Sequence, residues 1–348
     1  MSRTAIVFFN LGGPDSPEAV KPFLFNLFND PCIIGVPTPV RYLLAKLISA
    51  RRAPVAREIY GRIGGKSPLL ELTQEQAKAL EEAMDGETKV FIAMRYWHPM
   101  TEETVAAVKA WKPDQVVLLP LYPQYSTTTS KSSIGLWRQK AAAAGLEVPT
   151  RTICCYPTAP GMIEAFAALI APKLDEAAAH GRPRLLFSAH GLPKKVIAAG
   201  DPYQWQVEQS SAAVVSALNR PDLDWAVCYQ SRVGPLEWIG PSTEAELKRA
   251  GQDKVPVVVV PIAFVSEHSE TLVELDIEYG ELAHEVGIPA YLRVPALGSH
   301  PAFIRALADL VGKADGSSCD PCSQAGGRLC PSQFGGCPNA QPASGESR

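Results

Sequence analysis

The sequence predicts an α/β fold of two similar domains with parallel sheets around an interdomain cleft, followed by a Cys-rich C-terminal tail. Runs rich in Val, Ile and Phe alternate with longer helical patterns, which is typical of parallel sheets covered by helices on both faces. Each half of the chain holds three such strands, whose ends run into unusual polar or proline-containing loops. Four of the eight cysteines fall within the last 30 positions, which indicates a separate tail.

The composition is that of a globular protein. The chain has 348 residues, 46% of them hydrophobic, with 33 Lys and Arg against 36 Asp and Glu. The formal net charge of -3 gives no global positive field, so we expect no nucleic-acid partner. No uninterrupted apolar run approaches the roughly 18 residues that a membrane-spanning helix needs. The first residues suit a buried strand better than a secretory signal, so we expect a cytoplasmic protein.

Six segments carry the strand pattern. They are residues 5–9, 89–94 and 115–121 in the first half and residues 184–189, 225–230 and 255–264 in the second. The last segments of the two halves match best, because VVLLPLYPQYSTTTS and VVVVPIAFVSEHSET share a strand, a proline and a polar exit into a helix. Thr73 and Gln76 fit a capping box that begins a helix over residues 73–84, and Gly86 marks its end.

The repeat places a domain boundary near Tyr156 and Pro157. We therefore expect an N-terminal α/β domain over residues 1–156, a C-terminal α/β domain over residues 157–313, and a Cys-rich tail over residues 314–348 outside both cores. Ligands of open α/β sheets bind outside the carboxyl ends of the strands, so the polar loops of both domains should line one cleft.

Residues 20–60 break the alternation, because this segment is apolar, helix-like and interrupted by prolines. Arg and Lys side chains interleave with its apolar residues. We call the segment the lip, since this composition predicts an apolar edge in peripheral contact with an anionic membrane surface. Ordinary helical packing beneath a basic solvent face explains the same pattern equally well.

Four glutamates form a ladder after the last buried strand of the second half: Glu267, Glu270, Glu274 and Glu278. On an α-helix they would fall within roughly an 80° arc of one face. Like charges at this spacing destabilise a helix unless they bind cations or protons. A solvated helix face is the usual explanation of such a pattern. Because the ladder starts at the strand end that faces the predicted cleft, we interpret it as a relay for protons or a divalent metal.

His190 ends the strand over residues 184–189 and precedes a Gly-Leu-Pro turn. A histidine at the carboxyl end of a strand, opposite a glutamate helix, is a candidate base or metal ligand. Of the other histidines, His268 has a comparable position. The chain lacks G-x-S-x-G, Walker and G-x-G-x-x-G motifs, which argues against nucleophilic serine, phosphate and dinucleotide chemistry.

The tail carries four closely spaced cysteines: Cys319, Cys322, Cys330 and Cys337. Four thiolates in a short Gly- and Pro-rich segment suit sulfur coordination of one zinc ion or of an iron-sulfur cluster, and the spacing does not distinguish the two. Disulfides are not expected in a cytosolic chain. Because the segment has few apolar residues, the bound metal would supply its order.

Long motifs in both halves closely resemble those of ferrochelatases. They are LFSAHGLP followed by GDPY, QSRVGPLEWIGPSTE and PIAFVSEHSETLVELDIEY in the second half, and NLGGP, YGRIGGKSPL and RYWHP in the first. The resemblance covers roughly residues 4 to 312. It implies two Rossmann-like domains around a porphyrin cleft, with insertion of Fe(II) into protoporphyrin IX and release of two protons to give protohaem.

The same resemblance implies the roles of individual residues. His190 would be the base or metal-delivering ligand, Glu270 its carboxylate partner across the macrocycle, and His268 a residue that orients or assists Glu270. Together with His190 and Glu270, the outer glutamates Glu274 and Glu278 would hold the substrate iron on its path.

The porphyrin site is implied in the same way. Its candidate walls are Leu11, Tyr122, Tyr125, Trp238 and Phe264, and Arg62 and Arg95 stand where guanidinium groups would contact the pocket or the propionates. The lip matches the membrane-facing lip of the family, which implies a peripheral place on the inner face of the membrane and contact with other haem-pathway enzymes.

The tail resembles the two-iron two-sulfur (2Fe-2S) binding extension of some ferrochelatases. This resemblance predicts one cluster on Cys319, Cys322, Cys330 and Cys337, with a structural or sensing role because the iron enters and stays ferrous. Related enzymes commonly draw one ligand from the middle of the chain, so Cys154 and Cys155 are alternative ligands.

Two other functions fit the motifs. A chelatase acting on coproporphyrin III would use the same catalytic pair. A tetrapyrrole or metal-binding protein without turnover would share the cleft, but it would leave the pairing of His190 with Glu270 unexplained.

Overall fold

The structure is a computed structural model that describes residues 3–232 and 236–340. Its strands are β1 (Arg3–Asn10), β2 (Glu87–Met94), β3 (Gln115–Pro120), β4 (Thr150–Cys155), β5 (Arg184–His190), β6 (Asp224–Gln230), β7 (Val257–Pro261), β8 (Tyr291–Arg293) and β9 (Cys322–Ser323). The helices of the first half are α1 (Val20–Phe28), α2 (Thr38–Gly61), α3 (Leu69–Ala83), α4 (Thr101–Trp111) and α5 (Ser130–Ala143). Those of the second half are α6 (Pro160–Ala178), α7 (Lys194–Ala198), α8 (Tyr203–Leu218), α9 (Thr243–Asp253), the π-helix η1 (Glu270–Glu278), α10 (Tyr279–Glu285) and α11 (Pro301–Asp315).

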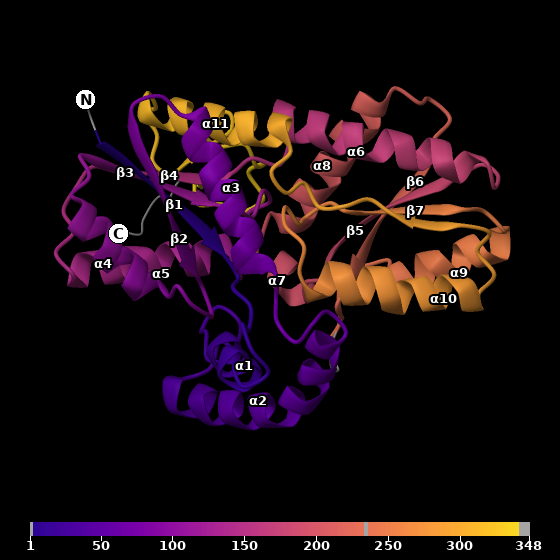
Figure 1. Ribbon diagram of the computed structural model, residues 1–348, viewed down its shortest axis with the longest axis horizontal. Helices are drawn as coiled ribbons and strands as arrows, with labels where there is room; N and C mark the ends of the chain where they lie inside the picture. Colours follow the sequence, from indigo (N-terminus) through magenta and orange to yellow (C-terminus); the bar gives the residue numbers. More distant parts are fainter. Residues whose placement is uncertain (1–2, 233–235, 341–348) are drawn as a thin grey trace.

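Two parallel sheets lie side by side (Figure 1). The first has the strand order β2-β1-β3-β4-β9 and the second has the order β6-β5-β7-β8, with parallel pairing throughout the described strands. The parallel α/β fold that the alternating strand and helix patterns predicted is therefore confirmed.

Both faces of each sheet are covered by helices, which explains why the strands read as continuous apolar runs. Along β1, Val7 and Phe9 pack with side chains of α4 and α5, whereas Ile6 and Phe8 belong to the core on the opposite face. Residues two apart on a strand share a face, so one strand supplies both cores. The second sheet repeats this arrangement, with α9 and α10 on one face and α6 and α8 on the other.

The last long helix returns to the first half of the molecule. α11 packs against α6 and also against α3 and β4, and one hydrophobic core runs through both halves beneath these helices. The expected boundary near Tyr156 and Pro157 falls between β4 and α6. The domain limits at residues 156 and 313 stay a prediction.

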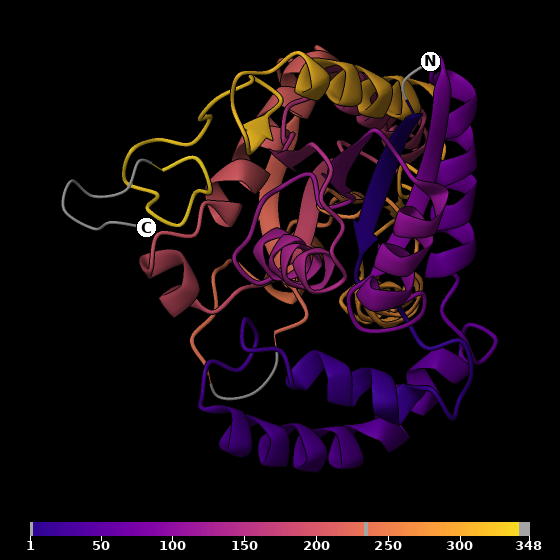
Figure 2. The ribbon, with the colours of Figure 1, turned by 90° about the vertical axis from the view of Figure 1, so that its left-hand side faces the viewer.

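We had expected the tail to lie outside both cores, but its described part does not. β9 pairs with β4, with Cys322 opposite Ile153, and the Thr152 amide donates to Asp320 Oδ1 at 2.7 Å. Cys322 is buried within the shared core. In Figure 2 the tail, in yellow, folds back against the body of the molecule. The unpaired edge of β4 gave the tail a strand to join, which composition alone does not reveal.

The capping box predicted at Thr73 and Gln76 is wrong. α3 begins four residues earlier, at Leu69, and the Thr73 hydroxyl donates to the Leu69 carbonyl at 2.6 Å. The Gln76 amide instead donates to the carbonyls of Val265 and Gly298, at 2.9 and 3.0 Å. Both side chains form hydrogen bonds with buried backbone carbonyls. Their spacing matches that of a capping box, but neither side chain caps the helix.

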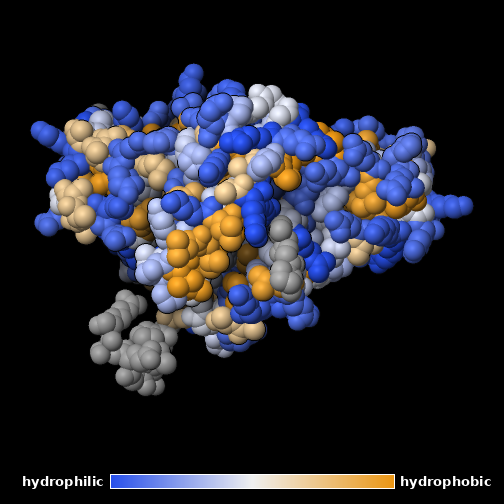
Figure 3. All heavy atoms as spheres, turned by 90° about the horizontal axis from the view of Figure 1, so that it is seen from below, coloured by the Kyte–Doolittle hydropathy of each residue, from blue (hydrophilic) through white to orange (hydrophobic). Residues whose placement is uncertain are grey.

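The lip forms α1 and α2, which stand apart from the two sheets at the bottom of Figure 1. Its inner side packs through Val20, Phe23 and Leu24 against Tyr96. Its outer side leaves large apolar side chains exposed on α2: Val40, Tyr42, Leu43, Leu47 and Val55. Figure 3, seen from below, shows apolar surface on this side of the molecule. Within the described ranges, no helix is both long and apolar enough to cross a membrane.

Candidate active site

His190 and Glu270 meet at the carboxyl ends of the strands of the second sheet. His190 is the last residue of β5, and Glu270 is the first residue of η1, which follows β7. The His190 Nδ1 atom lies 2.8 Å from Glu270 Oε2. The His190 side chain is 40% exposed, so this pair is open to a ligand entering from outside the strand ends. The strand-end argument therefore placed both residues together correctly.

The two partners shift each other's pKa in opposite directions. Desolvation lowers the pKa of His190, but the charge of Glu270 and the hydrogen bond to it outweigh this effect and raise the pKa above its ordinary 6.5. Burial raises the pKa of Glu270, yet the charge of His190 and their hydrogen bond lower it to about 2. The arrangement therefore favours a charged imidazolium-carboxylate pair when no substrate is bound.

Glu274 is joined to this pair through the end of β6. The Ser231 amide donates to Glu274 Oε1 at 2.7 Å, and the Ser231 hydroxyl lies between the carboxylates of Glu270 and Glu274. The Gln230 amide donates to Glu274 Oε2 at 3.1 Å, and the Tyr279 hydroxyl donates to Glu274 Oε1 at 3.1 Å. Burial and the charge of Glu270 raise the pKa of Glu274. Two neighbouring carboxylates thus differ in their tendency to hold a proton.

Sequence reasoning missed Gln230 and Ser231, because neutral polar side chains carry no charge pattern. Ser231 has a positive φ of 60°, a conformation that is uncommon for residues other than glycine and often marks functional sites. Their position directly after a buried strand, inside the QSRVGP motif, was the signal that could have identified them.

The remaining members of the glutamate ladder lie apart from His190. Glu278, at the end of η1, is exposed. Glu267 precedes η1 and pairs with Arg293, with Oε1 2.8 Å from Nη1. The ladder was expected on an α-helix, but Glu270, Glu274 and Glu278 lie on a π-helix, in which the hydrogen bonds run from i to i+5.

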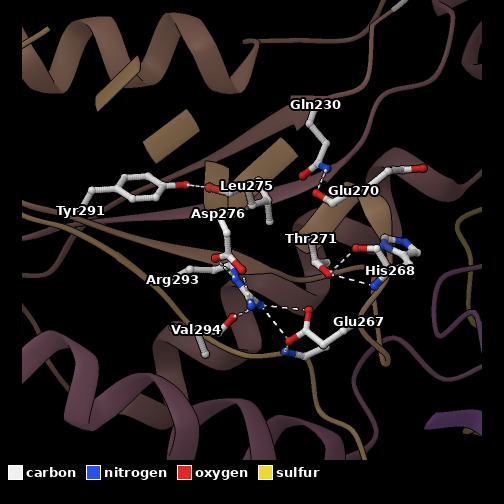
Figure 4. Close-up of polar contacts among 11 residues, drawn as sticks. Gln230, Glu267, His268, Glu270, Thr271, Leu275, Asp276, Tyr291, Arg293 and Val294 are labelled. Atoms are coloured by element: carbon white, nitrogen blue, oxygen red, sulfur yellow. Dashed lines mark hydrogen bonds and ion pairs between the residues drawn. The ribbon is translucent and has the colours of Figure 1, made fainter. Parts of the chain in front are cut away.

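His268 shares the site without a hydrogen bond to Glu270. Its ring packs edge-on against Phe264 at a centroid distance of 4.5 Å, and its backbone carbonyl and amide both bond to the Thr271 hydroxyl (Figure 4). Among the described residues its buried Nδ1 has no partner, and burial lowers the pKa of the ring. His268 therefore offers a neutral, unengaged ring nitrogen.

The candidate porphyrin residues fall into two groups. Leu11, Trp238 and Phe264 are half-buried, and Trp238 lines a cavity of about 390 Å³ that also contains Glu274 and Ser231. Tyr125 is buried instead among Cys154 and Cys155, away from this group. Tyr122 is half-buried and packs against the core of the first sheet.

The two candidate arginines also differ from each other. Arg62 is exposed and its nearest ion-pair partner is Glu58, at 3.8 Å. Arg95 pairs with the fully buried Asp30, with Nη2 2.8 Å from Oδ2, and also donates to Ser132 at 2.7 Å. The guanidinium of Arg95 therefore already has a carboxylate partner within the protein.

The cysteines of the tail do not share one environment. Cys330 and Cys337 are buried, the Gln206 amide donates to Cys330 Sγ at 3.1 Å, and the neighbouring Cys330 thiol lowers the pKa of Cys337. Cys154 and Cys155 are also buried, with their sulfur atoms 3.6 Å apart, whereas Cys319 is exposed. In residues 3–232 and 236–340, no group of three or more His, Cys, Asp or Glu is already arranged to hold a metal ion.

Comparisons with known proteins identify the family of the chain. A family model described as Ferrochelatase matches residues 3–315. A ferrochelatase of Caulobacter vibrioides is 56% identical, over 98% of this chain and 99% of that protein. A ferrochelatase of Phenylobacterium zucineum is 54% identical, over 96% of this chain and 97% of that protein.

Solved structures show the same fold in a distant chelatase. SirB from Bacillus subtilis, solved with Fe3+, is similar with a TM-score of 0.53 at 11% identity, over 90% of this chain and 95% of that one. The similarity to SirB shows only the fold, whereas the family model and the full-length relatives show the family. The chain belongs to the ferrochelatase family, the porphyrin metal chelatases that insert ferrous iron into protoporphyrin IX to give protohaem.

Proposed function

We propose that His190 and Glu270 perform the proton chemistry of iron insertion in this chain. The observation that carries the proposal is their contact of 2.8 Å at the open end of the second sheet. Ferrous iron and a neutral porphyrin give the metallated macrocycle and two protons. Each pyrrole nitrogen must lose its proton before it can bind the metal, so a base is needed against the macrocycle.

His190 accepts a pyrrole proton when its imidazole is neutral, and Glu270 stabilises the imidazolium that forms. Glu274, whose pKa is raised, takes up protons behind Glu270, and the exposed Glu278 continues the path toward solvent. The same oxygen ligands suit ferrous iron on its way inward. His268 supports the site through its neutral ring beside Phe264.

Anaerobic assays of the purified protein with Fe(II) test this function. Protoporphyrin IX and coproporphyrin III are supplied in parallel, and metallation is followed by absorbance. We expect turnover with protoporphyrin IX, because the family of the chain acts on this substrate. Faster turnover with coproporphyrin III would overturn the substrate assignment, and binding of both without turnover would indicate a carrier.

Trp238 and Phe264 are the best supported walls, because Trp238 lines the cavity beside Ser231 and Glu274 and Phe264 packs against the His268 ring, and Leu11 is a third, half-buried candidate. Tyr122 and Tyr125 stay as further wall candidates, and Arg62 as a contact to the propionates. Arg95 is assigned no direct contact with a propionate in this proposal, because Asp30 already balances the charge of its guanidinium. Fluorescence titration of Trp238→Ala with protoporphyrin IX checks the wall assignment, since loss of an aromatic wall weakens binding without removing the base.

The tail is proposed to bind a 2Fe-2S cluster. The donor chemistry fits, because buried thiols of the tail lie beside β4. The Cys322 thiol donates to the Thr152 carbonyl at 3.5 Å, and the side-chain amide of Asn339, two residues after Cys337, donates to Cys154 Sγ at 3.5 Å. Among the four tail cysteines, Cys319 fits least well, since it is exposed. A ligand set that replaces Cys319 by Cys154 or Cys155 agrees better with the burial of the thiols.

When bound, the cluster would supply a cross-link between the tail and β4. Protein isolated without oxygen should be coloured and carry iron with acid-labile sulfide, and stoichiometric zinc in colourless protein would contradict the proposal. Single Cys→Ser changes at all six positions identify the ligands. Loss of colour on changing Cys319 but neither Cys154 nor Cys155 would restore the set of four tail cysteines.

The lip is proposed to bind membranes peripherally. Val40, Leu43 and Leu47 recur at helical spacing on α2 and are exposed, and Lys46 and Arg51 provide cations beside them. Such binding would place the chain on the inner face of the membrane, where a poorly soluble porphyrin passes between it and other haem-pathway enzymes.

Flotation with anionic liposomes at low salt tests this proposal. Leu43→Ser together with Leu47→Ser should leave the protein in the soluble fraction, because both side chains are exposed and contribute little to the fold. Trp225→Ser, which changes an exposed aromatic side chain on β6, is the matched control. Equal recovery of all three proteins in the soluble fraction would favour ordinary packing of the lip.

A further inference from the structure

η1 is an unusual element that needs support from outside itself. It is a π-helix of nine residues, whereas π-helical geometry mostly occurs as a single-turn bulge within α-helices. The helix begins with Glu270 and includes Glu274, so its geometry determines where these carboxylates lie. Contacts that hold η1 in this form therefore bear on the candidate active site.

Two side chains of β8 reach η1 from the sheet. Tyr291 and Arg293 are two residues apart on the strand and so share one face, while Leu292 between them packs into the opposite core. The Tyr291 hydroxyl donates to the backbone carbonyl of Leu275 at 2.7 Å. Figure 4 shows both side chains pointing toward η1.

Arg293 joins the middle of η1 to the segment that precedes it. Its Nη2 donates to Asp276 Oδ2 at 2.8 Å and its Nε to the other oxygen of the same carboxylate. Its Nη1 donates to both oxygens of Glu267, at 2.8 and 3.0 Å, and the Ala296 amide donates to Glu267 Oε1 at 2.9 Å. The Arg293 side chain is 13% exposed, so solvent screens these ion pairs less than pairs on the surface.

These contacts bracket Glu270 along the chain. Glu267 lies three residues before it and Asp276 lies six residues after it, and one planar guanidinium holds both. On the other side, the Gln230 amide donates to the backbone carbonyl of Glu270 at 3.1 Å. The start of η1 is therefore fixed between β8 and the end of β6, and the Glu270 carboxylate is directed toward His190.

We propose that Tyr291 and Arg293 are positioning residues for iron insertion, which hold η1 in its wide form and thereby keep the Glu270 carboxylate against His190. This inference rests on the proposed function of that pair. Neither residue touches the substrate in the proposal. A displacement of about 1 Å at a reacting group can lower a rate by as much as 100-fold, so support at this distance affects turnover rather than binding.

Tyr291→Phe, Arg293→Lys and Arg293→Leu test the proposal. Tyr291→Phe removes only the hydroxyl, and Arg293→Lys keeps the charge but cannot bond both carboxylates through one planar group. We expect kcat to fall about tenfold for Tyr291→Phe and between about 10- and 100-fold for Arg293→Leu, with Arg293→Lys between them. Binding of protoporphyrin IX, measured by fluorescence, should change by less than about twofold in each variant.

The chain offers matched controls for lost stability. Arg184 pairs with Asp224 and Asp253, at 2.8 and 2.9 Å, at the opposite end of β5 from His190. The Tyr156 hydroxyl donates to the Pro120 carbonyl at 2.8 Å in the first sheet. Arg184→Leu and Tyr156→Phe should lower the melting temperature as the corresponding β8 variants do, while kcat of the folded enzyme stays unchanged.

Amide hydrogen exchange supplies a measurement independent of activity. Exchange over residues 270–278 should become faster in Arg293→Leu and stay unchanged in Arg184→Leu. Normal kcat in both Tyr291→Phe and Arg293→Leu, or an equal loss in the controls, overturns the positioning role. Glu270→Gln is assayed alongside: if it retains turnover, the proposed function fails, whereas an inactive Glu270→Gln with fully active β8 variants defeats the positioning role alone.

Discussion

At the scale of single residues, the chemistry depends on which partner of the His190–Glu270 pair holds the proton. The two groups stabilise each other's charged form when the cleft is empty. His190 must therefore lose its own proton before it can accept one from a bound porphyrin. The roles of the two residues can be separated by removing each in turn and by changing the pH.

His190→Ala should abolish metallation while leaving porphyrin binding nearly intact, because apolar walls rather than the imidazole hold the macrocycle. Glu270→Gln should act in the same way, since it keeps the shape of the side chain and removes its charge. Anaerobic metallation and fluorescence titration measure the two properties separately. Retention of more than a few per cent of turnover in His190→Ala would exclude it as the base.

The pH dependence of kcat/KM should report the raised pKa of His190. The neutral imidazole is the active form, so kcat/KM should rise with pH and level off above a pKa that is higher than the ordinary 6.5. In a variant that keeps some turnover, Glu270→Asp, a longer His190–carboxylate distance should move this midpoint to lower pH. A midpoint that stays in place would show that Glu270 does not control the protonation of His190.

The same shifts fix the sign of the pair's contribution to stability. The raised pKa of His190 contributes stability that is fully present below pH 6.5 and is lost as the pH rises through the pKa of the folded state. The lowered pKa of Glu270 contributes stability that is present above pH 4.5 and is lost as the pH falls through about 2. The pair therefore stabilises the fold most between pH 4.5 and 6.5.

Sequence reasoning found the residues that follow strands and missed those defined by long-range contacts. His190 and Glu270 were predictable as neighbours, because the carboxyl ends of parallel strands meet at one edge of a sheet. Arg95 was expected to contact the pocket or the propionates, and that role stays a prediction. Its ion-pair partner Asp30 was not foreseen, because Asp30 lies far away in the sequence and is not part of any motif. The partner of a buried charge depends on packing, which no local pattern contains.

At the scale of elements, the same limit applies to η1. The spacing of the glutamates indicated a helix, and a helix is present, but the change from α to π geometry depends on donors from other strands, such as Tyr291. The strands of the two sheets were easier to predict, because continuous burial on both faces makes a β-branched run almost unavoidable.

The lip is attached to the first sheet by a buried ion pair. Asp30, two residues after α1, is fully buried and accepts hydrogen bonds from Arg95, at 2.8 Å, from the Tyr96 hydroxyl, at 2.7 Å, from the Cys32 amide, at 2.8 Å, and from the Ser132 hydroxyl of α5. Four partners from three segments converge on this carboxylate, so it links the lip to the loop after β2 and to α5.

Asp30→Asn should therefore destabilise the protein by about 3–5 kcal/mol, because it leaves the charge of Arg95 uncompensated in a buried site. Thermal unfolding measures the loss, and hydrogen exchange over α1 should become faster. Glu58→Gln is the control, since the exposed pair of Glu58 with Arg62 contributes less than about 1 kcal/mol. Equal melting temperatures for the two variants would contradict a structural role of Asp30.

At the scale of the whole molecule, the tail connects the two halves. β9 extends the first sheet, while Phe334 packs on Trp205 of α8, with ring centroids 5.9 Å apart, and the Gly336 amide donates to the Gly200 carbonyl at 3.0 Å. Gly200 lies between α7 and α8, in the segment that follows His190. The internal repeat predicted the two sheets but not this connection, because the tail has no counterpart in the repeat.

Gly336→Ala tests whether the tail is held by this contact. A Cβ atom at Gly336 would lie 2.9 Å from the Gly200 carbonyl oxygen, which belongs to the backbone and cannot rotate away, whereas a Cβ atom at Gly335 would meet nothing within 4 Å. The clash should cost about 1–3 kcal/mol and separate the tail from the Gly200 loop, while Gly335→Ala should behave as the unsubstituted protein. Limited proteolysis of the tail measures the separation. Because the contact is made by backbone atoms of both segments, Gly336→Ala should expose the tail to cleavage even before the rest of the fold is affected, and tails that are equally resistant in the two variants would show that β9 and Phe334 suffice to hold it.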